Sequence, residues 1–276
     1  MKKPDREGVT DESELKGVVP DVVCDRFSDK GWVRTSVHVP NEIELAIHVN
    51  HRELVSLLCT PTKLDCLVLG FLRAEGIISG MNDVKSLQVC GDGSLADVML
   101  RDPEYELPTR LTLTSGCGGG AVFQTEGKKV DSDFLIAPAR VLSLMERLQE
   151  RMELYRLSGG VHTAALSDAN DLLVVTEDIG RHNTLDKIQG ECLLKGLSTE
   201  DRLVLCTGRV SSEMMLKAAR MRVPVVASRH SPTGKAVSLA RELGIALVGY
   251  ARGGGLSAYS HPERLGRVEP DKGGEK

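Results

Sequence analysis

The feature that most constrains the fold is a regular alternation of short apolar runs and helix-period segments in the second half of the chain. The order is strand 203–206, helix 212–221, strand 223–227, helix 233–243 and strand 246–250. Parallel strands need a crossover connection, and this succession of elements is typical of them. A hairpin pattern (161–166 and 172–176) and a helix (184–195) come before it. We therefore predict an α/β fold, a parallel or mixed sheet covered by helices.

The first half of the chain shows a different pattern. Apolar residues alternate with polar ones over 43–49 and are followed by the apolar run 54–58, which predicts a hairpin. Thr60-Pro61 then resembles a capped helix start, and an apolar stripe at helical spacing runs over 64–72. The spacing of Val141, Met145, Leu148, Met152 and Tyr155 predicts one helix over 138–157.

Three parts follow from these patterns. Residues 1–30 are rich in charge and poor in large apolar side chains, so we expect a mobile arm, with order beginning near Trp32. Residues 31–134 form a smaller α+β domain that ends in the Cys117 loop. Residues 135–276 form the α/β domain.

The net charge of −4 hides an asymmetry. Residues 207–276 hold 12 Lys and Arg side chains against 6 Asp and Glu, so this segment carries +6 and the rest carries −10. The balance argues against a nucleic-acid partner but allows a local anion site. No stretch approaches the roughly 20 apolar residues of a membrane span, and the first 30 residues have no signal-like apolar core. We expect a cytoplasmic protein with no membrane contact.

Three loops of similar composition follow the predicted parallel strands, at 207–213, 228–234 and 251–255. Each combines an arginine with glycine or hydroxyl residues, and the first two directly precede a helix. Free N–H groups at helix starts attract phosphate, and arginine adds bidentate pairing. A single loop of this kind is usually a capped helix start, but three at one sheet edge favour an anion or nucleotide site. Neither a Walker A motif nor G-x-G-x-x-G is present.

The densest polar run, Glu177 to Asn183, follows another apolar strand. Asn183 could simply cap a helix that begins at Thr184. Because two carboxylates, an arginine, an imidazole and an amide gather here, we favour ligand contacts by Arg181 and His182. His162 could join them, although alone it would be an ordinary strand histidine.

Seven cysteines at irregular spacing predict reduced thiols rather than a disulfide framework. We expect Cys59, Cys66, Cys90, Cys192 and Cys206 to be buried packing residues. Cys117 has glycine on both sides, which favours an accessible, reactive thiol. The alternative is a tight turn in which the cysteine is incidental.

A zinc deaminase or hydrolase is a further possibility, because His51-Arg52-Glu53 matches half of the deaminase signature. The sequence has no C-x-x-C to supply the other half, and the tripeptide falls on a predicted hairpin turn. We therefore expect no structural zinc.

The chain resembles the formate dehydrogenase accessory sulfurtransferase family, FdhD or NarQ. The similarity runs from about Glu42 to Leu265. Its ordered motifs are Gly70 to Ile78, Ser115-Gly116-Cys117-Gly118, Gly160 to Ala165, Glu177 to Asn183, Thr207 to Met214, Ser228 to Thr233 and Tyr259 to Arg264.

This resemblance implies a cytidine-deaminase-like α/β fold without its zinc chemistry, beside a smaller N-terminal domain. It implies a sulfurtransferase that takes persulfide sulfur from a cysteine desulfurase and passes it to the molybdenum (or tungsten) bis-guanine-dinucleotide cofactor, before that cofactor enters formate dehydrogenase. The persulfide would form on Cys117, GDP-like groups would bind, and the protein would be a homodimer. The expected cofactor contacts are Asp178, Arg181, His182, Asn183, Thr207, Gly208, Arg209, Ser211, Ser212, Arg229, His230, Ser231, Thr233, Tyr250, Ala251, Arg252, Gly253, Gly254 and Gly255.

One residue departs from the family pattern. Many members carry a C-x-x-C here, whereas this chain has Gly120 in the place of the second cysteine. The departure argues against a mechanism that needs both thiols. Two other hypotheses remain: a non-covalent cofactor chaperone in which Cys117 is dispensable, and a deaminase-like hydrolase acting on a free nucleotide.

Overall fold

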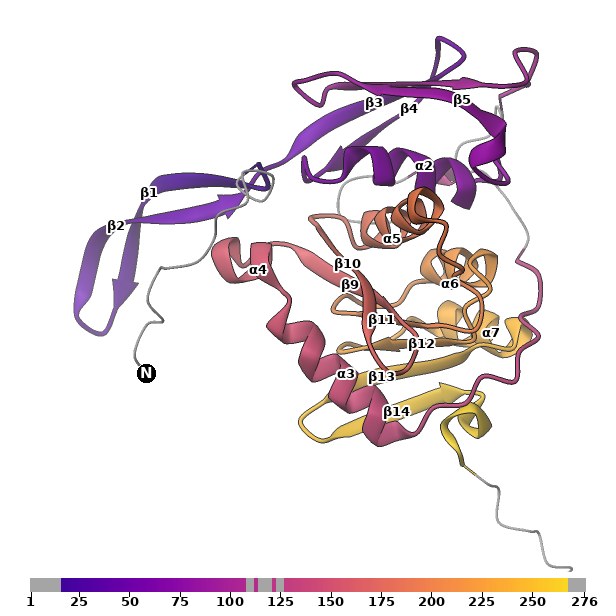
Figure 1. Ribbon diagram of the computed structural model, residues 1–276. Coiled ribbons are helices and arrows are strands. Elements are labelled where there is room, and N and C mark those ends of the chain that lie inside the picture. The colour runs from indigo at the N-terminus through magenta and orange to yellow at the C-terminus, as the bar shows by residue number, and fades with distance from the viewer. Residues whose placement is uncertain (1–15, 108–111, 114–120, 123–126, 268–276) are drawn as a thin grey trace, which may run out of the picture.

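The computed structural model describes residues 16–107, 112–113, 121–122 and 127–267. In Figure 1 the described chain forms a long hairpin, a sheet with one helix, and a larger layered domain. Cys117 and its neighbours lie outside the described residues, as do residues 1–15.

The chain begins with an antiparallel two-stranded ribbon, β1 (Val18–Ser28) and β2 (Gly31–Pro40), which projects from the body (Figure 1). Gly31 adopts φ +89° at the turn, a conformation that glycine tolerates. Regular secondary structure therefore begins at Val18 and not near Trp32 as expected, because residues 18–28 pair along β2. Alternating Val and Thr residues favour the extended conformation even where few of them are buried.

The N-terminal sheet has the strand order β4-β3-β6-β5. Its strands are β3 (Ile43–Val49), β4 (Arg52–Cys59), β5 (Val84–Val89) and β6 (Leu95–Leu100), with the short helix η1 (Met81–Asp83) before β5. The predicted hairpin is confirmed as β3–β4, with Asn50 and His51 both at positive φ in its turn. Leu45, Ile47 and Val49 point into a core shared with helix α2.

Helix α2 (Leu64–Ala74) covers this sheet, but it does not begin at Thr60-Pro61 as the sequence suggested. Lys63, in the left-handed region, precedes the first helical residue, and no side chain caps the helix. Thr60 instead forms hydrogen bonds with Asp178 and Ile179 of the second domain. Short strands β7 (Thr112–Leu113) and β8 (Ala121–Val122) follow.

The C-terminal domain is a six-stranded sheet with the order β10-β9-β11-β12-β13-β14. Its strands are β9 (His162–Ser167), β10 (Leu172–Asp178), β11 (Leu203–Cys206), β12 (Val225–Ser228), β13 (Ala246–Arg252) and β14 (Gly255–Ser260). Strands β11, β12 and β13 are parallel, as predicted, and the outer strands make the sheet mixed. The α/β prediction is confirmed at this level.

Helices cover both faces of this sheet. Helices α5 (Arg181–Lys195), α6 (Ser212–Arg220) and α7 (Gly234–Leu243) pack on one face, and α3 (Pro138–Glu150) packs on the other. Alternate residues of each strand face the two layers: Val204 joins the α5–α7 side while Leu203 and Leu205 join the α3 side. The helix predicted over 138–157 is interrupted at Arg151 and Met152 and resumes as α4 (Glu153–Ser158). The short helix η2 (Pro262–Leu265) ends the described chain.

The sequence places the end of the smaller domain at residue 134, but the stretch before this residue already contacts the C-terminal domain. Val130 already belongs to the core between the C-terminal sheet and helices α5–α7, and its N–H donates to the Leu243 carbonyl at 2.8 Å. Apolar residues are too sparse in this connecting stretch for their spacing to show which core they join. None of the helices in the described ranges is long and apolar enough to cross a membrane.

The two domains meet where α2 crosses α5 (Figure 1). A Cβ atom placed on Gly70 would lie 1.7 Å from the Asp186 carbonyl oxygen, and one on Gly190 would lie 1.8 Å from the Cys66 carbonyl oxygen. Glycine at both positions lets the two backbones touch. Every residue of α5 from Arg181 to Cys192 is buried, because α2 covers one side of the helix and the sheet covers the other.

Candidate functional site

Four strand ends converge at one edge of the C-terminal sheet. Strands β11, β12 and β13 are parallel, and β10 runs in the same direction because both β10 and β11 are antiparallel to β9. Their carboxyl ends therefore share an edge, at which β9 begins with His162. The crevice beyond this edge is where open α/β sheets bind ligands.

A cavity of about 370 Å³ opens at this edge. The strand ends contribute His162, Thr207, Arg229, His230 and Arg252, and the segment around α4 contributes Met152, Tyr155, Gly159, Gly160 and Val161. The structure thus brings together four of the expected contacts, together with His162. The sequence analysis did not predict that the segment around α4 forms one wall of the cavity. The Gly159-Gly160 pair, which ends a helix directly before β9, was the one sequence signal for it.

His162 lies at the centre of this arrangement. A Cβ atom on Gly208 would be 3.1 Å from His162 Nδ1 and 3.2 Å from Arg181 Cβ, so a glycine here lets three segments meet. Burial lowers the pKa of His162, and the charges of Arg181, His230 and Arg209 lower it further. The imidazole is therefore neutral near pH 7 and stands among cations.

Arg181 has a buried donor without a partner. It is the first residue of α5 and is 6% exposed, yet its Nε makes no hydrogen bond within the described part of the chain. The N-cap residue, Gly180, offers no side-chain cap to the helix start. An anion bound at this turn would satisfy both the guanidinium and the free N–H groups. Arg181 does not line the cavity itself, but its unpartnered buried donor makes it a candidate contact for an anion.

His182 does not project freely toward a ligand. Its Nε2 lies 2.8 Å from Ser211 Oγ and 3.3 Å from Glu213 Oε2. Burial lowers the pKa of His182 to about 3 and raises that of Glu213 to about 7, so the contact is not an ion pair at neutral pH. Both neighbours meet the same ring nitrogen, which differs from a catalytic triad, where the imidazole uses both nitrogens.

Asp178 and Asn183, two further expected contacts, are committed to the interior. Asp178 is fully buried, and its carboxylate accepts hydrogen bonds from four groups of the protein. The Asn183 amide donates to Asp178 Oδ1 and to the Leu58 carbonyl. Asn183 is not the helix cap either, because α5 begins two residues earlier. The side chains of these two predicted contacts are therefore already bonded to groups of the protein.

Two of the loop hydroxyls act as helix caps. Ser211 Oγ accepts from Met214 N at the start of α6, and Thr233 Oγ1 accepts from Ala236 N at the start of α7. The capped-start alternative therefore holds for these two side chains. Ser212 is the first residue of α6, and Arg209 and Ser231 lie in the same two loops, which leave strands β11 and β12 at the site edge.

The third loop is the β13–β14 hairpin. Gly253 and Gly254 adopt positive φ in its turn, and Tyr250 does so at +53°. The Arg252 guanidinium lies 5.8 Å from the Tyr250 ring centre, a cation–π contact beside the cavity. Ala251 is fully buried, so its side chain is not available to a ligand.

Of the six described cysteines, four are buried, Cys24 is half-buried and Cys90 is exposed. Burial raises the pKa of Cys59 and Cys66 to about 12 and that of Cys192 and Cys206 to about 11, so these four thiols stay protonated. Cys90 is exposed, contrary to the expectation that it packs in the core, because it lies in the β5–β6 turn. The reactive thiol predicted from sequence, Cys117, lies outside the described residues.

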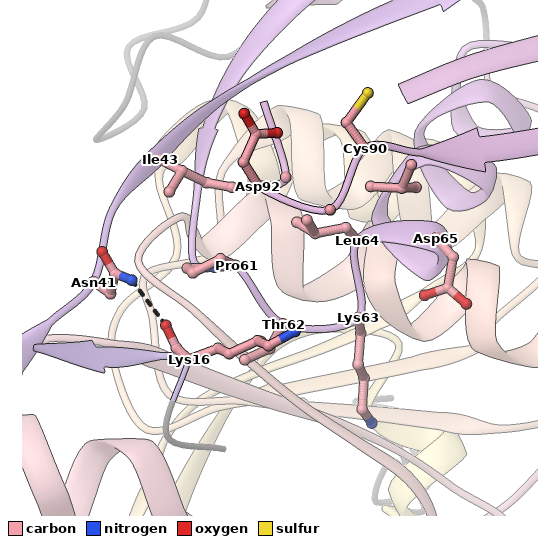
Figure 2. A pocket seen from close by; sticks show the side chains of 13 residues that line it. Lys16, Asn41, Ile43, Pro61, Thr62, Lys63, Leu64, Asp65, Cys90 and Asp92 are labelled. Atoms are coloured by element: carbon pink, nitrogen blue, oxygen red, sulfur yellow. Dashed lines mark hydrogen bonds between the residues drawn. The ribbon is translucent and has the colours of Figure 1, made fainter. Parts of the chain in front are cut away.

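A larger cavity of about 570 Å³ lies on the N-terminal domain, away from the strand ends. Figure 2 shows that it is formed by the base of the ribbon, the segment before α2 and the β5–β6 turn, with Ile43, Pro61 and Leu64 among its walls. None of the expected contact residues lines it. His51, the histidine of the deaminase-like tripeptide, lies on the exposed β3–β4 turn. Its Nδ1 is 2.6 Å from Oδ2 of Asp97 on β6. Within the described ranges, no three His, Cys, Asp or Glu side chains gather in a way that could hold a metal ion.

The fold and the site define an α/β protein with a cationic pocket at the carboxyl edge of its sheet. The chain belongs to the FdhD/NarQ family, whose model matches residues 40–266. It is 36% identical over 248 residues to proteins named sulfur carrier protein FdhD from Staphylococcus aureus strains MRSA252 and JH9. In each case the match covers 87% of this chain and 94% of the relative. The crystal structure of a protein described as a formate dehydrogenase accessory protein from Desulfotalea psychrophila matches with a TM-score of 0.75 and 26% identity. That match covers 90% of this chain and 99% of the other.

Proposed function

We propose that this protein is a sulfurtransferase of formate dehydrogenase maturation. It accepts persulfide sulfur from a cysteine desulfurase and delivers it to the molybdenum (or tungsten) bis-guanine-dinucleotide cofactor, which is its substrate. The names of the Staphylococcus relatives and the description of the Desulfotalea structure support the sulfur-carrying and accessory parts of this role.

The observation that carries the proposal is the cationic pocket at the strand ends. Arg229, His230 and Arg252 line the cavity. Arg181 packs near Gly208, as does the cavity-lining His162, and its buried Nε has no partner in the described chain. A guanine dinucleotide brings a pyrophosphate, and arginine pairs with phosphate through bidentate hydrogen bonds. The pocket suits the nucleotide part of the cofactor, and Thr207 adds a hydroxyl to it.

The sulfur chemistry is assigned to Cys117. Its thiolate attacks the terminal sulfur of the desulfurase persulfide, the S–S bond of the desulfurase breaks, and the desulfurase cysteine leaves as a thiolate. Cys117 then carries the persulfide, and no external oxidant or reductant is consumed in this step. Four of the other cysteines are unsuited to it, because burial keeps them protonated and the thiolate is the attacking form.

The test is the mass of the intact protein after incubation with a cysteine desulfurase and cysteine. We expect wild type to gain one sulfur atom and Cys117→Ser to gain none. Cys90→Ser is the matched control, because Cys90 is exposed and should not be needed. No gain on wild type, or an equal gain on Cys117→Ser, would contradict the proposal.

A non-covalent cofactor chaperone would use the same pocket without the thiol. Complementation separates the two functions, because full formate dehydrogenase activity with Cys117→Ala would favour the chaperone. The proposal also includes a cytidine-deaminase-like fold, a cytoplasmic location and a homodimer. Analytical ultracentrifugation of the full chain tests the homodimer.

A further inference from the structure

A fully buried ion pair lies behind the first turn of α5. Lys187 Nζ is 2.6 Å from Asp178 Oδ2, and both side chains are 0% exposed. Neither residue lines the cavity, so the pair cannot act on a ligand directly. The pair joins the last residue of β10, Asp178, to the body of α5.

The Asp178 carboxylate organises the turn from β10 into α5. Oδ1 accepts from Gly180 N at 2.7 Å and from Asn183 Nδ2 at 2.8 Å. Gly180 and Asn183 flank Arg181 and His182, so this one oxygen fixes both ends of the turn that carries Arg181.

The other side of the pair reaches the N-terminal domain. Asp178 Oδ2 accepts from Thr60 N at 3.1 Å, and Lys187 Nζ donates to the Thr60 carbonyl at the same distance. Thr60 Oγ1 accepts from Ile179 N at 3.1 Å, and Lys187 also donates to Thr62 Oγ1. The segment between β4 and α2 is therefore bonded to the same turn from the opposite side.

A buried ion pair of this kind adds little net stability, but it specifies one conformation of the groups that it joins. Desolvation of two buried charges offsets most of their attraction, whereas their hydrogen bonds hold the joined groups in one geometry. Here those groups are the Arg181 turn and the Thr60 segment.

We infer that Asp178 and Lys187 are positioning residues for anion binding: the pair holds the first turn of α5 so that Arg181 and the uncapped N–H groups face the strand-end pocket. The inference rests on the proposed function, because it assumes that this pocket binds the nucleotide.

The test compares two neutral double variants by isothermal titration with GDP. Asp178→Asn with Lys187→Met removes the pair without leaving a lone buried charge. Asp186→Asn with Lys217→Met is the matched control, since Lys217 Nζ on α6 lies 2.6 Å from Asp186 Oδ1 on α5 in a second buried pair. All titrations are made below the unfolding temperature of each variant.

We expect the first double variant to bind GDP at least about tenfold more weakly than wild type and the control to stay within about twofold. Hydrogen exchange should rise at 181–184 in the first variant, and persulfide loading of Cys117 should be unchanged in both. If the first double variant does not fold, Thr60→Val removes only the acceptor for Ile179 N, and we expect it to weaken GDP binding about threefold.

GDP binding within about twofold of wild type in the first double variant, or an equal loss in both, would overturn the inference. A wild type that loads persulfide but does not bind GDP would overturn the assignment of the pocket, and this inference with it. A wild type that binds GDP but loads no sulfur would contradict only the sulfur-transfer function.

Discussion

The α2–α5 crossing and the β1–β2 ribbon are opposite extremes of packing in one chain. At the crossing, Gly70 and Gly190 bring two helix backbones into contact, and twelve successive residues of α5 are buried. In the ribbon, the single tryptophan of the protein, Trp32, is 72% exposed and contacts Phe27, itself 66% exposed.

The two regions differ in what surrounds them. A two-stranded ribbon has no second layer and gains stability only at its base, where Val18 packs with Leu154 and Val161. Helix α5 is covered by α2 on one side and by the sheet on the other. Its neighbours therefore restrict which residues fit, as at Gly190 and at the buried Asp186 and Lys187. The first turn of α5 carries Arg181, so this candidate anion contact lies on a helix that is buried along twelve successive residues.

The largest expected effect is at the helix crossing. Gly190→Ala places a methyl group against the Cys66 backbone, which cannot move aside as a side chain can, so α2 and α5 must separate. We expect a loss of about 3 kcal/mol or more in the free energy of unfolding, measured by urea denaturation.

The matched control is Gly234→Ala in the first turn of α7, where a Cβ atom would meet nothing within 4 Å. We expect this variant to change stability by less than about 1 kcal/mol. Equal losses in the two variants would contradict the close approach of α2 and α5.

A smaller, pH-dependent effect is expected at Glu213. Burial raises its pKa from 4.5 to about 7, so between these values the folded state holds a proton that the unfolded state lacks. The stability of wild type therefore falls as pH rises through this window, and the cost is complete above pH 7.

Glu213→Gln removes this ionisation and keeps a donor near His182. We expect the variant to be about 1–3 kcal/mol more stable than wild type near pH 8, with the gain vanishing near pH 4. The lowered pKa of His182 destabilises both proteins alike on acidification, so it cancels in the difference. A gain that does not depend on pH would exclude ionisation as the cause.

The smallest expected effect is in the ribbon. Trp32→Ser removes a ring that is mostly exposed and contacts one other exposed ring, so we expect less than about 1 kcal/mol of change in urea denaturation. GDP binding should be unchanged. A loss as large as that of Gly190→Ala would mean that the ribbon is as constrained as the helix crossing.

Local patterns in the amino-acid sequence predict the α/β succession and the edge of the sheet at which polar loops gather. Strands β11 to β13 follow from apolar runs of strand length, and the positions of Thr207, His230 and Arg252 follow from the rule that parallel strands end together. These inferences depend on local pattern and chain direction, both of which can be taken from a linear sequence.

Which polar side chains keep an unpartnered group depends instead on packing between distant segments. Asp178, Arg181, His182 and Asn183 are neighbours in one motif, yet three of them bond to protein groups and only Arg181 keeps a buried donor without a partner in the described chain. The partners come from residues such as Thr60 and Ser211, distant in the sequence. Hydrogen-bond satisfaction depends on packing between elements, and no local pattern records it.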